Sequence, residues 1–309
     1  MKSATDISYP AGTCALLGRP NVGKSTLLNA ILGQKLAITA SKPQTTRAQI
    51  LGVYTQKEPP AQIALVDTPG LHKPHGPLGR ALVEAAKSSL HQCDVRLLIT
   101  EAPAAQKGAE HFAERDRNVI ELLADVKGPT LLALNKIDQL PNKDALLPII
   151  EAYAKLYPFA EIVPISALRK KQINVLISAI CKHLPEGPHY DEQFLTDRPT
   201  RFFAAELVRE AAIRNTHQEV PYGVAIVVDT FEESQKPIHI AMTLVVERES
   251  HKKILIGTRG SMIKKIGSEA RKEIEELVGG QVFLELWVKV IPDWTQNPRY
   301  IQELVLAQS

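Results

Sequence analysis

One loop near the start of the chain has the residue types and spacing that can bind phosphate groups. Residues 18–25 read GRPNVGKS, which fits the pattern GxxxxGK[ST]. In such a loop the backbone N–H groups surround the phosphates, and the helix that follows adds the positive end of its dipole. We expect Lys24 to reach the β- and γ-phosphates and the hydroxyl of Ser25 to coordinate Mg²⁺. The loop therefore predicts a site for a nucleoside triphosphate.

Three shorter motifs follow, and each stands at the end of an expected buried strand. DTPG supplies Asp67, which can hold Mg²⁺, and Gly70, whose N–H can approach the γ-phosphate. NKID ends in Asp138, and SAL begins with Ser166. The carboxylate of Asp138 can accept hydrogen bonds from N1–H and the 2-amino group of guanine, whereas adenine would leave it desolvated and unpaired. The joint order of the four motifs predicts a GTPase domain.

A polar stretch between the first two motifs is the candidate switch loop. Residues 36–52 read LAITASKPQTTRAQILG and fall where a loop has to fold over the γ-phosphate and Mg²⁺. We expect Thr46 to supply the Mg²⁺-binding hydroxyl, with Thr45 as the alternative. An ordinary surface loop is the other interpretation.

Two residues bear on how hydrolysis is promoted. Leu71 follows Gly70, so an apolar side chain stands where Ras-like GTPases place a water-orienting glutamine. We therefore expect slow intrinsic hydrolysis or another way of stabilising the transition state. Asn21 offers a carbonyl oxygen near the phosphates that can hold a monovalent cation, and we hypothesise that K⁺ stimulates hydrolysis.

These motifs define the residues of the expected nucleotide site. The expected catalytic residues are Lys24, Thr46, Gly70 and Asn21, and the expected Mg²⁺ ligands are Ser25, Thr46 and Asp67. The expected nucleotide contacts are Asn21, Val22, Gly23, Lys24, Ser25, Thr26, Asp67, Gly70, Asn135, Lys136, Asp138, Ser166 and Ala167.

A second glycine loop lies near the other end of the chain, in the stretch ILIGTRGSMIKKIG at 254–267. It lacks the GK[ST] ending, which argues against a second nucleotide site. A run of charges is usually a solvated helix face, but here basic residues flank a glycine loop between two expected helices. That is the arrangement of a KH domain, whose GxxG loop grips the backbone of single-stranded nucleic acid. The expected RNA contacts are Gly257, Thr258, Arg259, Gly260, Lys264 and Lys265.

Apolar residues beside this loop have two interpretations. Ile256, Ile263 and Ile266 can line a groove for bases, but we expect most of them to be core and one to touch RNA. Trp287 and Trp294 can stack on a base, but core or rim packing is the preferred interpretation.

The elements that must position the first site form an alternating pattern from about Gly12 to Leu184. Near-continuous apolar strands separated by helix-like segments are typical of a mostly parallel sheet covered on both faces. The pattern predicts an α/β P-loop GTPase domain over residues 1–184 and a proline-rich linker over 185–200. The expected strands are residues 13–18, 63–68, 95–100, 130–135 and 161–166.

After the linker the order of elements changes. A helical pattern over 201–217 precedes two expected strands, a short helix, the glycine loop, a long helix and a final strand. In the final strand apolar residues from Leu284 to Val290 alternate with Glu285, Trp287 and Lys289. We therefore expect a small α+β RNA-binding domain with a C-terminal tail over 201–309.

The composition is that of a globular, non-membrane protein. Its 309 residues are 44% hydrophobic and 23% charged, and the net charge of +3 is too small to name a partner. We expect no transmembrane helix and no secretory signal, because no long apolar run is present. The cysteines, Cys14, Cys93 and Cys181, have no paired spacing, which predicts reduced thiols. His72 and His75 are expected to be solvated rather than metal ligands.

The motifs and the C-terminal pattern together resemble the bacterial Era GTPases. The resemblance rests on GRPNVGKSTLLNAILGQKLAITASKPQTTR, VDTPGLHKP, NKID, SAL, EVPYGVAIVV and IGTRGSMIKKIGSEARKEIE, and covers about residues 13–292. It implies a Ras-like GTPase domain followed by a type II KH domain, and it supports Thr46 as the switch threonine and Asn21 as a K⁺ ligand. One departure is the order Thr258–Arg259, because the family's loop is usually basic first and small second.

The resemblance also implies partners and a location. It implies binding of GTP and GDP, of the 3′ end of small-subunit (16S) rRNA and of the 30S subunit during ribosome assembly. Members are cytoplasmic, with partial peripheral contact at the inner membrane, and we expect a monomer. The alternative is a signalling GTPase whose C-terminal domain docks on a protein or membrane partner. A metabolic P-loop kinase is disfavoured by NKID, since guanine selectivity has no use there.

Overall fold

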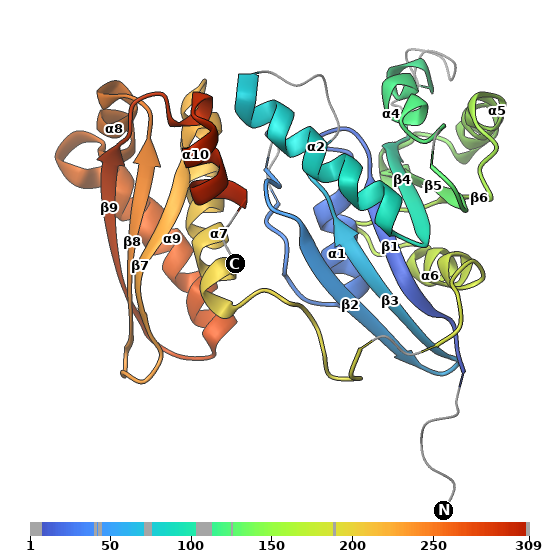
Figure 1. The fold of residues 1–309 in the computed structure, drawn as a ribbon, viewed down its shortest axis with the longest axis horizontal. Coiled ribbons are helices and arrows are strands. Elements are labelled where there is room, and N and C mark those ends of the chain that lie inside the picture. The colour runs from blue at the N-terminus through green and yellow to red at the C-terminus, as the bar shows by residue number, and fades with distance from the viewer. Residues whose placement is uncertain are drawn as a thin grey trace, which may run out of the picture. The chain divides into compact units, whose positions relative to one another are not determined.

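The computed structural model describes residues 8–39, 42, 45–70, 76–102, 113–124, 126–187 and 190–306. They form two compact units (Figure 1). The first unit comprises residues 1–36, 49–72 and 83–197, and the second comprises 37–48, 73–82 and 198–309. The expectations on Leu71, His72 and His75 fall outside the described residues and stay predictions.

The first unit is built on a six-stranded sheet with the strand order β2-β3-β1-β4-β5-β6. All neighbouring strands are parallel except β2, which runs antiparallel to β3. Central β1 lies between β3 and β4, and both run parallel to it, so the strand order reverses at β1. Sheets of this kind bind ligands at the carboxyl ends of the strands beside such a point. The strands are β1 (Ala11–Leu17), β2 (Ile50–Lys57), β3 (Pro60–Asp67), β4 (Val95–Glu101), β5 (Thr130–Asn135) and β6 (Glu161–Pro164).

Helices cover both faces of this sheet. Ala15 and Leu17 of β1 belong to a core cluster with side chains of α2, α4 and α5. Leu16 between them is also fully buried, and since successive side chains alternate it faces the opposite layer. Helices α1 and α6 pack against each other and against β3. The helices are α1 (Lys24–Leu32), α2 (Gly76–Gln92), α4 (Arg117–Glu121), α5 (Leu146–Leu156) and α6 (Ile173–Cys181).

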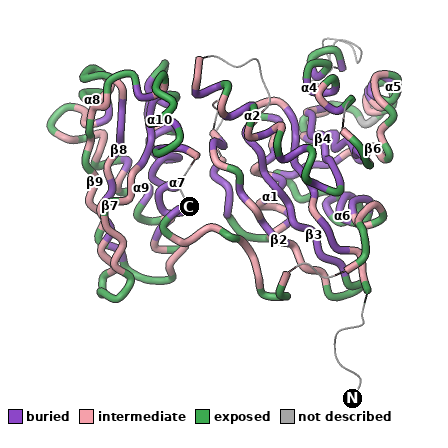
Figure 2. The backbone as a smooth tube through the Cα atoms, in the orientation of Figure 1, coloured by how far each residue is buried: buried purple, intermediate pink, exposed green. Residues whose placement is uncertain are grey.

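Edge strand β2 is the one strand of the larger sheet in the described chain that the sequence did not predict. It pairs with β3 along its length, from Ile50 opposite Asp67 to Lys57 opposite Pro60. Its residues are only partly buried, in contrast to the nearly continuous burial of β1 and β3 (Figure 2). An edge strand lacks the continuous apolar run by which buried strands are recognised.

The second unit contains a three-stranded sheet with the order β7-β8-β9. Strand β8 runs antiparallel to β7 and parallel to β9, and a bulge interrupts β7 between Val228 and Thr230. Its elements are α7 (Thr200–Asn215), β7 (Ala225–Glu232), β8 (Ile238–Val246), α8 (Glu249–Ile256), α9 (Ser261–Val278) and β9 (Val282–Val290). This order of elements confirms the predicted α+β plan.

Two apolar clusters stabilise the second unit. Ile266, Ala270 and Ile274 form one stripe of α9 and pack with α7 and the inner face of the sheet. The predicted alternation in β9 is confirmed, because Leu284, Leu286 and Val288 join this cluster. Trp294 lies in the other cluster and is fully buried, with its indole N–H donating to the carbonyl of Gly223 at 3.1 Å.

Substitutions of the two tryptophans should therefore differ in their effect on stability. Trp294→Phe should lower the free energy of unfolding by about 1–3 kcal/mol, because the Gly223 carbonyl loses its donor and the smaller ring leaves a void. Trp287, which is 64% exposed on β9, is the matched control, and Trp287→Phe should change it by less than about 0.5 kcal/mol. Urea unfolding followed by far-ultraviolet circular dichroism measures both, and equal effects would contradict the core assignment of Trp294.

Candidate functional site

The phosphate loop joins β1 to α1, as the sequence predicts. It passes so close to its neighbours that two glycines have no substitute: a Cβ on Gly18 would lie 2.2 Å from a carbonyl oxygen of β4, and one on Gly23 would lie 2.3 Å from the amide nitrogen of Asn135. Asn21 and Gly23 have positive φ angles of 66° and 103°. Such left-handed residues turn successive N–H groups toward one centre, which makes a concave anion site.

Asn135 connects the loop to the segment after β6. Its side-chain amide donates to the carbonyl of Val22 at 2.8 Å, and its carbonyl oxygen accepts the N–H of Ala167 at 2.9 Å. Asn135 is 2% exposed, so both of its polar groups are used inside the protein. It therefore holds the phosphate loop and the SAL loop at a fixed spacing. Its contact with the nucleotide stays a prediction.

Lys136 also contacts the phosphate loop. Its ammonium group donates to the carbonyl of Asn21 at 2.7 Å and to the carboxylate of Glu101 at 2.7 Å. Glu101 is a site residue that the sequence did not reveal. It ends β4, and the register of the sheet places it opposite Asn135. An acid at the carboxyl end of a strand beside NKID was the available signal, but its meaning depends on which strands are neighbours.

Asp138 and Ser166 come together as expected for a guanine site. The hydroxyl of Ser166 donates to one carboxylate oxygen of Asp138 at 2.5 Å, and it accepts the N–H of Arg169 at 3.1 Å. Ser166 is fully buried, whereas Asp138 is exposed. The serine thus orients a carboxylate that faces outward, where it can accept hydrogen bonds from a ligand.

Lys24 lies under the loop as the pattern predicts. It is 6% exposed, and its ammonium group donates to the carbonyls of Gly18 at 3.1 Å and Arg19 at 3.3 Å. Burial lowers the pKa of Lys24, and the negative charge of Asp67 acts in the opposite direction. The ammonium is therefore held inside the ring of loop residues, where phosphate oxygens are better partners than carbonyls.

Ser25 and Asp67, two of the expected Mg²⁺ ligands, contact each other in the first unit. The Ser25 hydroxyl donates to Asp67 at 3.0 Å, so two oxygen ligands meet beside the phosphate loop. A hydroxyl and a carboxylate are the hard oxygen donors that suit Mg²⁺. Gly70 follows three residues after Asp67, and a Cβ on it would lie 3.2 Å from Pro20, so its backbone lies beside the phosphate loop. Thr26 lies partly buried in the first turn of α1.

Thr46, the third expected metal ligand, is grouped with the second unit and is 8% exposed. Its neighbour Arg47 is buried and donates to the carbonyls of Val224 at 2.6 Å and Tyr222 at 2.8 Å, within the same unit. Burial, and then the positive charge of Arg209, lowers the pKa of Arg47 to about 9, so the guanidinium stays charged at neutral pH. The role of Thr46 as a ligand stays a prediction.

The second glycine loop is a single turn between α8 and α9. Gly257 has φ 71°, and a Cβ on it would lie 2.7 Å from the backbone nitrogen of Met262, while Gly260 has φ 79° and precedes α9. Thr258 and Arg259 occupy the tip and are exposed. Arg259 has φ 51°, a left-handed conformation that is uncommon for arginine. The two glycines are therefore needed for the turn, and they leave an arginine at its tip.

Basic side chains continue from this loop along α9. Lys264 and Lys265 are seven residues before Arg271 and Lys272, and a spacing of seven places them on one face of the helix. All four are exposed or half-exposed, whereas Ile266, Ala270 and Ile274 form the buried face.

Of the expected groove residues, Ile266 is core, and Ile256 and Ile263 are half-buried beside the loop. Trp294 is core as expected, whereas Trp287 is not, because it is 64% exposed.

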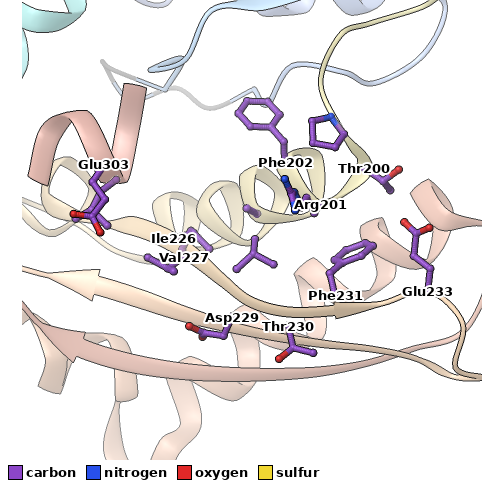
Figure 3. A pocket seen from close by; sticks show the side chains of 14 residues that line it. Thr200, Arg201, Phe202, Ile226, Val227, Asp229, Thr230, Phe231, Glu233 and Glu303 are labelled. Atoms are coloured by element: carbon purple, nitrogen blue, oxygen red, sulfur yellow. The ribbon is translucent and has the colours of Figure 1, made fainter. Parts of the chain in front are cut away.

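A cavity of about 720 Å³ lies elsewhere in the second unit, between the start of α7, strand β7 and residues 303–304 (Figure 3). Its walls include Phe202 and Phe231. Of the charged residues that line it, three are acidic and one is basic: Asp229, Glu233, Glu303 and Arg201. Phosphate groups would be repelled by this rim, so the basic glycine loop is the better nucleic-acid site.

Two kinds of feature are absent from the residues that the structure describes. Among the residues in the described ranges, no helix is both long and apolar enough to cross a membrane. Among the same described residues, no group of three or more histidine, cysteine, aspartate or glutamate side chains could hold a metal ion.

Comparison with known proteins decides the family. Residues 13–136 match the 50S ribosome-binding GTPases, and residues 219–295 match the KH domain. The chain is 47% identical over 300 residues to GTPase Era of Ruminiclostridium cellulolyticum, covering 96% of this chain and 98% of the relative. It is 46% identical to GTPase Era of Geotalea uraniireducens, covering 97% and 98%. The chain belongs to the Era family of GTPases.

Two solved Era structures share the fold over nearly the whole chain. A point variant of Aquifex aeolicus Era bound to GDP·AlF4⁻ has a TM-score of 0.86 and 40% identity, over 96% of this chain and 98% of that one. Era in complex with MgGDPNP and nucleotides 1506–1542 of 16S ribosomal RNA has a TM-score of 0.89 and 39% identity, with the same coverage. The predicted fold class, a P-loop GTPase domain with a C-terminal KH domain, is confirmed. As a member of the Era family, the chain is a GTPase.

The geometry of Asp138 predicts a change in base specificity in this Era-family chain. Asp138→Asn should weaken GTP binding about 100-fold and improve xanthosine triphosphate binding, because an amide can donate to the 2-oxo group that replaces the 2-amino group. Competition with a fluorescent guanine nucleotide measures both affinities. The matched control is Asp144→Asn, since Asp144 is exposed and contacts Asn142. An unchanged ratio of the two affinities in Asp138→Asn would contradict the assignment.

Proposed function

We propose that this chain is an Mg²⁺-dependent GTPase that binds the 3′ end of 16S rRNA through its KH domain and acts in assembly of the 30S subunit. The observation that carries the RNA-binding half is the exposed Arg259 at the tip of the glycine turn, continuous with the basic face of α9. The RNA bound to the related Era structure supports the identity of the ligand. We propose residues 1–184 as the GTPase domain, 185–200 as the linker and 201–309 as the RNA-binding domain.

In the nucleotide half, the residues of this chain bind and orient GTP. Lys24 moves from loop carbonyls to the β- and γ-phosphates, and the loop N–H groups surround the β-phosphate. Ser25, Asp67 and Thr46 would hold Mg²⁺, which neutralises the charge that develops on the γ-phosphate. The bound MgGDPNP of the related Era structure supports Mg²⁺ as the metal ion. The N–H of Gly70 orients the γ-phosphate, and Asp138 selects guanine.

In the RNA half, the glycine turn lets a nucleic-acid strand approach the backbone. Arg259 contacts a phosphate, and Lys264 and Lys265 add affinity that does not depend on sequence. Thr258 at the first variable position places the charge one residue later than in the family pattern. Ile256 and Ile263, which are half-buried beside the loop, are the apolar surface that receives a base.

We also propose where this protein acts and which partners it binds. We infer a cytoplasmic monomer, with GTP, GDP and the 30S subunit as its partners and with peripheral contact at the inner membrane. The family match over residues 13–136 names the 50S subunit. The KH domain and the RNA-bound relative favour the small subunit for this chain. The signalling alternative predicts no affinity for an oligonucleotide with the sequence of the 16S rRNA 3′ end.

The salt dependence of RNA binding tests the glycine turn. Arg259→Asn should weaken binding of a 3′-end 16S oligonucleotide and reduce the slope of log K against log salt by about 1, because one phosphate contact is lost. Asparagine is chosen because it tolerates the positive φ of this position better than alanine. Affinity for GTP should not change. Fluorescence anisotropy of the labelled oligonucleotide measures its affinity, in the presence of a GTP analogue and of GDP, both in K⁺ buffer.

The matched control for that experiment is Lys236→Gln. Lys236 is exposed in the turn before β8, at the opposite end of that strand from α8. It should leave both RNA affinity and the salt slope unchanged. If Arg259→Asn keeps the wild-type salt slope, Arg259 makes no phosphate contact, and if the unaltered chain fails to bind the oligonucleotide, the RNA-binding proposal fails.

The role of K⁺ is tested at Asn21. Replacing Na⁺ by K⁺ should raise the rate of GTP hydrolysis, because a cation on the side-chain carbonyl oxygen of Asn21 adds positive charge beside the phosphates. Asn21→Gly should remove the stimulation while keeping the backbone, since glycine adopts the φ of 66° without strain. Phosphate release in the two salts measures the rates. Equal rates in K⁺ and Na⁺ for the unaltered chain would exclude the hypothesis.

A further inference from the structure

Asp116 is a buried carboxylate that belongs to none of the nucleotide-binding motifs. It is 0% exposed and lies directly before α4. One carboxylate oxygen accepts the guanidinium N–H of Arg19 at 2.5 Å, and the other accepts the phenol of Tyr153 at 2.6 Å and the hydroxyl of Thr100. The last two side chains also contact each other at 2.9 Å. Four elements of the first unit therefore meet at one carboxylate.

The Asp116 side chain has no local role in the helix that follows it. Its backbone angles are helical, φ −95° and ψ −1°, and not those of a capping residue. Within the described residues the Asp116 side chain caps no N–H of α4; its backbone carbonyl accepts the N–H groups of Val119 and Ile120. Burial, and then the charge of Asp116, raises the pKa of Tyr153, so the phenol stays protonated and donates. The carboxylate thus accepts its hydrogen bonds from Arg19, Tyr153 and Thr100 and not from α4.

Arg19 makes this network relevant to GTP. It is the second residue of the phosphate loop, and its own carbonyl is one of the two that accept the ammonium group of Lys24. The other end of the loop is held through the carbonyls of Asn21 and Val22. The ion pair of Arg19 with Asp116 therefore adds a separate tether, which acts on the first half of the loop.

We propose that Asp116 is a positioning residue for nucleotide binding, and that it acts by holding Arg19 and so the first half of the phosphate loop. The loop contains Asn21 in a left-handed conformation, which carries an energetic cost for a non-glycine residue, and Gly23, which loses much conformational freedom when its backbone is fixed. A loop that is already held in this shape loses less conformational freedom when phosphate binds, which raises affinity. Asp116 itself touches no nucleotide; its effect passes through the ion pair.

The ion pair is strong enough for this role. A charge-assisted bond between a buried carboxylate and a guanidinium is among the stronger hydrogen bonds in proteins. Arg19 is 19% exposed and Asp116 is not exposed, so solvent screens the pair little. Tyr153 and Thr100 both donate to the other carboxylate oxygen, which fixes its orientation toward Arg19.

Nucleotide affinity in four variants tests the proposal. Kd for a fluorescent GDP and for a GTP analogue should rise about tenfold in Asp116→Asn and in Arg19→Ala, which corresponds to about 1.4 kcal/mol. The double variant should be no weaker than the weaker single variant, because both changes break one interaction. Arg19→Lys, which keeps a charged donor, should recover part of the affinity. The rate of Asp116→Asn at saturating GTP should change by less than about twofold, since preorganisation acts on binding.

Three outcomes would overturn the proposal. If the thermal midpoint falls in Asp116→Asn while Kd stays within about twofold of wild type well below that midpoint, the network only stabilises the fold. If Arg19→Ala weakens binding and Asp116→Asn does not, Arg19 contacts the nucleotide directly. If the two effects add, they are independent. Arg117→Ala is the matched control, because Arg117 is exposed and pairs with Glu114 on the surface; its Kd should equal that of wild type.

Discussion

The phosphate loop has to keep its backbone in a shape that is costly in the absence of a ligand, and the larger sheet is arranged around that requirement. Asn21 holds a positive φ angle, which costs energy in a non-glycine residue, and Gly23 has to be fixed in a left-handed conformation. Side chains from the carboxyl ends of neighbouring strands hold this shape. Asn135 and Lys136 at the end of β5 bind the carbonyls of Val22 and Asn21. The residues proposed to recognise GTP therefore also hold the loop in shape.

These tethers explain why the strand order matters more than any single motif. Glu101 ends β4, which pairs with β5, and so its carboxylate reaches Lys136. Asp67 ends β3, which pairs with β1, and so it reaches Ser25 in the first turn of α1. Parallel strands bring their carboxyl ends to one edge of the sheet. Residues far apart in the sequence thus form one polar layer there, and each motif is completed by a neighbouring strand.

The two glycine loops use related chemistry under different constraints. Both need glycine because a Cβ would collide with backbone or side-chain atoms, at Gly18 and Gly23 in one and at Gly257 in the other. The first loop is surrounded by tethers and carries a buried lysine, which suits a compact triphosphate. The second exposes Thr258 and Arg259 at its tip and continues into a basic helix face. An open loop with extended positive charge suits a long phosphate backbone.

Much of the fold and of the site can be read from the sequence. The four motifs fall at strand ends because buried parallel strands are continuous apolar runs, and the 3.6-residue period of α9 separates its basic face from its buried one. Spacing alone could not show the edge strand β2, since a half-exposed strand lacks such a run. It also could not separate Trp287 from Trp294, because burial depends on which elements pack together. Only the tertiary structure decided that Glu101 meets Lys136 and that Asp116 holds Arg19, because side chains 35 and 97 residues apart pair through folding and not through sequence proximity.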